Sequence, residues 1–570
     1  MQMLKRTGLS LIIALSLVAC SSDKNDETIG AKDSSPTSAK QNVVFQELLS
    51  HVPANTAYLV ANDKRVPENV MKVHVDRMKT FFTSLEGMLN SKTENGVEKE
   101  PQEKFALALF DALGKDISVE TWKKNGLVAN AHSVIYGLDL KPVARMEIAS
   151  KDAFKAMIAK AETDSGHKVT WESCAGVDCL QVGEEAQKVV FAITDTQLIV
   201  TYHDGTNVEA LFNHIAGKAK PEAAYKVADW KGFVEKNNYS GYGAGFVKMA
   251  DMLNQVEIFA KAEAKKTGGD SFDEAAFTNC FGVAKKHAEY AQELVFGTKT
   301  MDEKRIDYEI LLKTTPEVSA VLKGLPNNLQ GFKSTADPIF NFGLNVNFAN
   351  MRDALSQYIN FIATTGEEQK CASINPDELR KSIGGLSMAM AMGLGQFKAF
   401  SIAIDNVEMD ESTSQPKKVE AFATVMADDP MALLQMLAMV NPIFATLEVP
   451  ADGSVVPLPE GLLPPNPVVP TLSLSRKDQS LNILVGNDKP ALQDVELATS
   501  TFLWGKMDNK RYYGLLGGVM GNIPQGAQAA DAETQEALKF MQSMGDITGK
   551  SSYQMGADDR GLLINYQINY

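Results

Sequence analysis

The sequence lacks the features that would place it in several common classes. No apolar run reaches the roughly 18 to 20 residues that a membrane-spanning helix needs. Basic residues number 56 against 71 acidic ones, and the net charge of −15 argues against a nucleic-acid-binding surface. Because 44% of the 570 residues are hydrophobic, the chain can still bury more than one core, which indicates a globular protein.

Motifs for catalysis are also lacking. The sequence has no G-x-S-x-G nucleophile elbow, no H-E-x-x-H zinc motif and no glycine-rich phosphate loop of the G-x-x-x-x-G-K or G-x-G-x-x-G type. The seven histidines all lie between His51 and His287. His203 and His214 could face one another across a turn and a helix, but Asp204 beside His203 fits a turn residue. We therefore expect structural or solvated histidines, and no catalytic residue, metal or cofactor is predicted.

The first twenty residues have the pattern of an export signal. Lys5 and Arg6 precede a ten-residue apolar stretch that ends at Val18, and Cys20 follows closely. The ending Leu-Val-Ala-Cys resembles the lipobox of bacterial lipoproteins, a resemblance confined to residues 1–20. It implies that the signal peptide is removed before Cys20 and that this cysteine is acylated, with palmitate among the acyl chains.

The residues after the cysteine add an expected location. Ser21 stands where lipoproteins kept in the inner membrane usually carry Asp, so the resemblance implies an outer-membrane anchor, facing the periplasm or the cell surface. Residues 1–19 are then the signal peptide. Residues 20–42 are polar and Ser-rich without hydrophobic periodicity, which predicts a flexible tether. The expected membrane contact is through acyl chains on Cys20, because two or more chains anchor stably.

The cysteine count agrees with export. Without Cys20, four cysteines remain, an even number that predicts two disulfides in an oxidising compartment. Cys174 and Cys179 flank Ala-Gly-Val-Asp between two strand-like segments, so a hairpin turn would bring them together. Cys280 and Cys371 then pair by elimination. A zinc site is the weaker alternative, because no second Cys or His pair stands at a matching spacing.

The two halves of the chain resemble each other in four places. The matches are residues 48–56 (LLSHVPANT) with 321–329 (VLKGLPNNL), MEIASKD from Met146 with ATVMADD from Ala423, the strand–turn–helix segments from Ile193 and Ser475, and IDYEI (306–310) with INYQI (564–568). The offsets are 273, 277, 283 and 258 residues, always in the same order, where the third is measured from Leu198 to Leu481. A tandem duplication is therefore predicted.

The duplication predicts an α+β chain of two similar domains, residues 43–316 and 317–570. Segments of alternating apolar and polar residues predict antiparallel sheets, with amphipathic helices packed against them. Asp152 and Asp429 are expected as helix N-caps, with Pro430 at the first helical position.

Methionine is unusually frequent, with 24 residues. Six of them make up a candidate apolar groove: Met388, Met390, Met392, Met431, Met436 and Met439. The sequence MAMAM, residues 388–392, is taken as a strand, which would space three thioethers too widely for one copper ion. The methionines therefore either fill the core of the second domain or line an adaptable groove for lipid or lipoprotein.

The sequence favours a non-enzymatic role: a lipid-anchored envelope lipoprotein that binds or scaffolds another envelope component. Two alternatives stay open, the handling of lipid or another hydrophobic ligand, and an envelope hydrolase without a recognisable motif. The expected partners are the membrane, reached through Cys20, and an envelope protein or lipid, with no nucleic acid.

Overall fold

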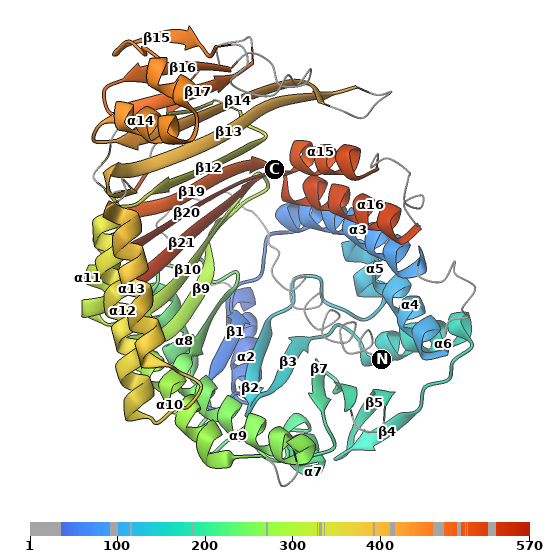
Figure 1. The fold of residues 1–570 in the computed structure, drawn as a ribbon. Coiled ribbons are helices and arrows are strands. Elements are labelled where there is room, and N and C mark those ends of the chain that lie inside the picture. The colour runs from blue at the N-terminus through green and yellow to red at the C-terminus, as the bar shows by residue number, and fades with distance from the viewer. Residues whose placement is uncertain are drawn as a thin grey trace.

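The structure is a computed structural model of the full chain (Figure 1). It describes residues 36–91, 101–114, 117–184, 187–268, 272–327, 329, 333–335, 337–391, 394–410, 416–459, 472–486, 492–495, 497–498, 500–521 and 532–570. The predicted signal peptide and Cys20 lie outside these residues.

One antiparallel sheet of 19 strands runs through the described part of the chain, and a two-stranded sheet accompanies it. Its hydrogen-bonded order is β4-β5-β6-β7-β3-β2-β1-β8-β9-β10-β21-β20-β19-β12-β13-β14-β17-β16-β15. The strands up to residue 314 are β1 (Tyr58–Asn62), β2 (Ser133–Leu138), β3 (Lys141–Glu147), β4 (Trp171–Cys174), β5 (Val177–Glu184), β6 (Gln187–Ile193), β7 (Gln197–His203), β8 (Ala244–Lys248), β9 (Ala291–Met301) and β10 (Arg305–Thr314). Those after it are β11 (Lys333–Thr335), β12 (Phe340–Asn345), β13 (Phe397–Met409), β14 (Pro416–Ala427), β15 (Asp452–Pro457), β16 (Leu472–Lys477), β17 (Ser480–Val485), β18 (Leu492–Asp494), β19 (Thr501–Asp508), β20 (Lys550–Asp558) and β21 (Gly561–Asn569).

Helices surround this sheet, so the predicted α+β class is confirmed. Those before residue 315 are α2 (Pro36–Leu49), α3 (Glu68–Ser91), α4 (Pro101–Gly114), α5 (Val119–Lys124), α6 (Lys151–Ser165), α7 (Val208–Ile215), α8 (Val227–Lys236), α9 (Met249–Gly268) and α10 (Glu274–Tyr290). Those after it are α11 (Pro316–Lys323), α12 (Phe348–Glu368), α13 (Pro376–Ala391), α14 (Pro430–Val440), α15 (Asn509–Gly521) and α16 (Ala532–Thr548), with short 3-10 helices η2 (Leu394–Gln396) and η3 (Pro442–Thr446).

The sheet is continuous across the expected domain boundary at residue 316. The central pair, β10 with β21, joins the two halves. Outward from β10 come β9, β8, β1, β2, β3, β7, β6 and β5, and outward from β21 come β20, β19, β12, β13, β14, β17, β16 and β15. The two expected domains therefore have no separate sheets, and their strands follow one another in corresponding order from the centre.

The register at the centre relates the two matching pentapeptides. IDYEI lies on β10 and INYQI on β21, each the closing strand of a hairpin, as predicted. Tyr308 pairs with Tyr566, so each central tyrosine faces its own sequence match. Ile310 and Ile568 each lie two residues after the central tyrosine of their strand. Moving from each residue to its partner on the next strand, away from the centre, leads from Ile310 to Ala144 on β3 and from Ile568 to Ala421 on β14. These two alanines are 277 residues apart, the offset found for the Met146 match.

Both faces of the first-half sheet are buried. Helices α3, α4, α5 and α6 cover one face through a core that includes Met146, Leu198 and Phe105. Helices α2, α7 and α8 cover the other through a core that includes Leu48 and Trp230. The cores described in the second half are smaller. Helix α14 and η3 contribute side chains to one of them.

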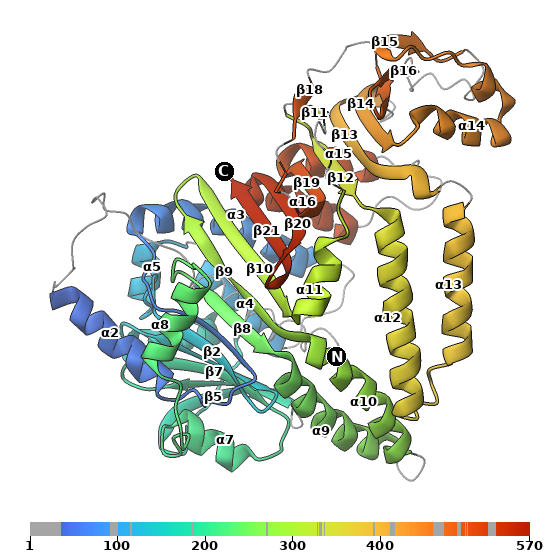
Figure 2. The same cartoon turned by 90° about the vertical axis from the view of Figure 1, so that its left-hand side faces the viewer.

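Helices from different halves pack against one another. Helix α3 lies beside α16, and α10 lies beside α12, which Figures 1 and 2 show at opposite sides of the sheet. At the second contact the His287 ring meets the Phe361 ring with centroids 5.0 Å apart. The disulfide Cys280–Cys371 links α10 to the turn after α12, so it joins the two halves covalently.

Both predicted disulfides are confirmed. Cys174 ends β4, and Cys179 lies in β5 beyond a tight turn formed by Ala175 and Gly176. Both turn residues have positive φ angles, 50° and 90°, which is the twist that two-residue hairpins favour. The turn therefore brings the two sulfurs together as the sequence indicated.

Several local predictions need correction. The side chain of Ser150, not Asp152, caps α6 by accepting a hydrogen bond from the Ala153 amide, whereas Asp429 does accept from the Met431 amide before α14. Residues 388–391 belong to helix α13, so the strand assignment of MAMAM was wrong. Alternating Met and Ala suit a helix because both are good helix formers. Helix α2 begins at Pro36, inside the predicted tether 20–42. The helix expected near the end of the segment from Ser475 was also wrong, because residues 492–494 form strand β18, which pairs with β11.

Candidate functional site

The central strands present a row of large apolar side chains on one face of the sheet. Register pairing places them in two lines across β9, β10, β21, β20, β19, β12 and β13. We call them the apolar face: Phe296, Ile310, Ile564, Met555, Leu503, Leu344 and Phe400 in one line, and Tyr308, Tyr566, Tyr553, Gly505, Phe342 and Ile402 in the other. No charged residue occurs among these thirteen positions.

The apolar face is open although its residues are typical of a core. None of its large side chains is buried, and Phe400 and Ile402 are 38% and 41% exposed. On the opposite face, β12 and β13 bury even polar Asn341 and Ser401, which are 1% and 2% exposed, whereas Lys506 on β19 and Asn565 on β21 are exposed. A contiguous apolar surface left open in this way is typical of a site that contacts another molecule.

Close packing fixes the middle of the apolar face. The Tyr553 ring lies over Gly505, where a Cβ would come within 2.6 Å of a ring atom, so only glycine fits at that position. Burial raises the pKa of the Tyr553 hydroxyl, which keeps it protonated at neutral pH. The centre of the face is therefore uncharged and shaped by aromatic rings.

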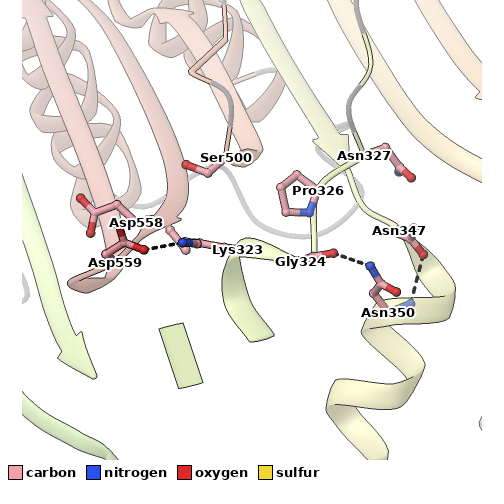
Figure 3. A pocket seen from close by; sticks show the side chains of 10 residues that line it. Lys323, Gly324, Pro326, Asn327, Asn347, Asn350, Ser500, Asp558 and Asp559 are labelled. Carbon is pink, nitrogen blue, oxygen red and sulfur yellow. Dashed lines mark hydrogen bonds and ion pairs between the residues drawn. The ribbon is translucent and has the colours of Figure 1, made fainter. Parts of the chain in front are cut away.

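A polar pocket of about 580 Å³ lies elsewhere, where α11, the start of α12 and the β20–β21 turn meet (Figure 3). Its side chains are largely satisfied by one another. Asn350 donates to the Gly324 carbonyl over 2.6 Å, and Lys323 forms an ion pair with Asp559. Asp558 is bound by Arg560 over 2.7 Å. The pocket can offer hydrogen bonds to a polar molecule, but its two carboxylates are both ion-paired. Among the described residues that line it, no nucleophile is hydrogen-bonded to a base.

A buried polar cluster lies in the first half beneath α2 and α7. Arg145, 1% exposed, donates to the Tyr136 hydroxyl over 3.2 Å, to Gln197 over 3.0 Å and to the His214 and Ile215 carbonyls at the end of α7. These hydrogen bonds hold the C-terminus of α7 against the sheet, which is a structural role.

The histidines of this region do not form the pair that the sequence allowed. His214 contacts the Tyr136 hydroxyl at 2.8 Å, and His203 contacts Gln181 at 3.0 Å. Burial, assisted by the charge of Arg145, lowers the pKa of His51 to about 3 and that of His214 to about 4. Both imidazoles are neutral at physiological pH.

The predicted methionine groove is only partly described. Met431 is half-buried against the core under α14. Met392 and the side chains of Met388, Met390, Met436 and Met439 lie outside the described residues.

Sequence reasoning missed the apolar face. Its signal was the alternation in KRIDYEILL, where Tyr308 and Ile310 point to the open face while Glu309 and Leu311 are buried. Alternation shows that two faces differ, but it does not show which of them is covered.

Among the described residues, no helix is both long and apolar enough to span a membrane, and no group of three or more His, Cys, Asp or Glu side chains could hold a metal ion. No family model, curated protein or solved structure matches this chain.

Proposed function

We propose that this protein is a lipid-anchored lipoprotein of the bacterial outer membrane that binds or scaffolds another envelope component and has no enzymatic activity. The lipobox-like ending at Cys20 supports the anchor. The two disulfides, which persist mainly in oxidising compartments, support an exported protein.

We infer that the chain arose by tandem duplication into two similar α+β domains that share one sheet. The corresponding strand orders support this history, as does the pairing of Tyr308 with its own match Tyr566. A residue that faces its own counterpart is typical of a twofold, self-complementary interface. The duplication therefore resembles a fused dimer.

The open apolar face is the observation that carries the binding role. Thirteen uncharged positions across seven strands resemble the core of a protein interface, where charged residues are depleted and aromatic residues are enriched. A second candidate, the handling of lipid or another hydrophobic ligand, is supported by the same aliphatic and aromatic lining.

Footprinting in the native envelope tests the binding role. Hydroxyl-radical labelling, read by mass spectrometry, should modify Phe400 and Ile402 several-fold less in intact envelopes than in the purified protein, because a bound component covers them. Ile258 on α9, 71% exposed, is the control and should be labelled equally in both samples. Equal labelling of all three residues would contradict the proposal. Native mass spectrometry after gentle extraction then distinguishes bound lipid from bound protein.

The anchor is tested separately. Cys20→Ser should abolish incorporation of radiolabelled palmitate, while the wild type incorporates it. Incorporation into the variant, or none into the wild type, would show that the chain is not anchored through this residue.

A further inference from the structure

On the side of the sheet that carries the apolar face, corresponding residues of the two halves differ in how deeply they are buried. Stepping from strand to strand through paired residues, starting at the central pair, matches Met146 with Ala423 and Leu198 with Ile483. The sequence match of Leu198 with Leu481 is therefore displaced by two residues. Met146 and Leu198 are buried, 8% and 1% exposed, whereas Ala423 and Ile483 are half-buried.

The same pairing matches Ser133 with Ile402. The first-half position is a half-buried serine that donates a 2.9 Å hydrogen bond to Asn62, but the second-half position is an exposed isoleucine. At this position the second half is therefore both more apolar and more exposed than the first half.

A helix accounts for the cover in the first half. Helix α4 packs on α6 and places Phe105 and Leu109, 1% and 5% exposed, in the same core as Met146 and Leu198. In the second half α14 follows β14 as α6 follows β3, and α13 occupies the place of α4 in the chain order. Helix α13, however, packs along α12, as Figure 2 also shows.

Resting on the binding role proposed above, we infer that Phe342, Phe400 and Ile402, together with Ala423 and Ile483, dock an amphipathic helix of a partner protein. This surface continues the part of the sheet on which α14 packs, because Ile483 also packs against the core that contains α14. A helix in the position that α4 occupies in the first half would extend that interface across β13. Its anchors would be apolar residues at positions i, i+4 and i+8, the spacing of Phe105, Leu109 and Leu113 in α4.

The chain provides its own probe. A fluorescein-labelled peptide of residues 101–114, the α4 sequence, is titrated with the acylated full-length protein in lipid nanodiscs and followed by fluorescence anisotropy. The control peptide carries Asn in place of Phe105 and Leu109. We expect saturable binding of the first peptide and at least tenfold weaker binding of the control.

Two exposed isoleucines give matched variants. Ile402→Asn should weaken peptide binding at least tenfold, whereas Ile258→Asn on α9 should leave it unchanged. Equal binding of the two peptides, or binding that Ile402→Asn does not affect, would overturn the inference. If a dansyl-labelled fatty acid binds in an Ile402-dependent way and the peptide does not bind, the occupant is a lipid. The helix inference then fails while the binding face stands, whereas failure of the footprinting test removes both.

Discussion

Two buried histidines should make the first half sensitive to acid. His51 and His214 are 7% and 6% exposed, and burial next to the charge of Arg145 lowers their pKa values to about 3 and about 4. In the unfolded chain both should titrate near the ordinary value of about 6.5. Below pH 6.5 the unfolded chain therefore binds more protons than the folded protein, and stability falls with pH until the folded histidines titrate.

The size of the effect follows from the shifts. One pH unit corresponds to about 1.4 kcal/mol for each histidine that is protonated only when unfolded. Between pH 7.5 and pH 5.0, each histidine should therefore lower the free energy of unfolding by about 2 kcal/mol, or about 4 kcal/mol for the pair.

Urea denaturation at the two pH values measures this loss, with tryptophan fluorescence as the signal. Three of the four tryptophans, Trp122, Trp171 and Trp230, lie in the first half. A variant with His51→Gln and His214→Gln should lose about 4 kcal/mol less than the wild type over this pH range. His167→Gln, outside the cluster, should behave as the wild type does. If the double variant keeps the full pH dependence, the cluster is not its source and the reasoning is refuted.

Three further predictions concern single contacts. Arg145→Met should lower the free energy of unfolding by about 3 to 5 kcal/mol, because it leaves buried carbonyls at the end of α7 unpaired; thermal denaturation measures it. Removing the second disulfide with Cys280→Ala and Cys371→Ala should cost roughly 4 to 5 kcal/mol in the chain-entropy model and speed amide exchange in α10 and α12, with unchanged exchange as the contrary result. Ser150→Ala should cost about 1 kcal/mol by removing the cap of α6, and Asp152→Ala clearly less; equal losses would show that the cap contact is unimportant.

The sequence allowed the Cys174–Cys179 disulfide, the antiparallel strands and the closing hairpins to be predicted because these depend on local signals. Parity paired Cys280 with Cys371, and alternation identified β10 and β21. Cap choice was less certain, because Ser150 and Asp152 are both good N-cap residues and lie two positions apart.

Local sequence signals could not predict features that depend on contacts between distant parts of the chain. The periodicity around Ile306 and Ile564 shows that strands exist, but the pairing of these strands depends on the register between residues 258 positions apart in the chain. The apolar face escaped prediction for a similar reason. Ile402 alternates with Ser401 as any half-buried strand would. Only the structure shows that α13 packs along α12 and that Ile402 is exposed.

The charges on β10 and β21 favour pairing between these two strands over pairing between two copies of β10. Asp307 faces Gln567, whose amide donates to it over 2.9 Å, and Glu309 faces Asn565. If two copies of β10 paired in this register, Asp307 would face Glu309 on both sides of the tyrosine, and like charges directly opposite destabilise a sheet. All the acids lie on one strand and all the amides on the other. The first half is therefore disfavoured from pairing with another first half, and each chain is directed to close its sheet with its own second half.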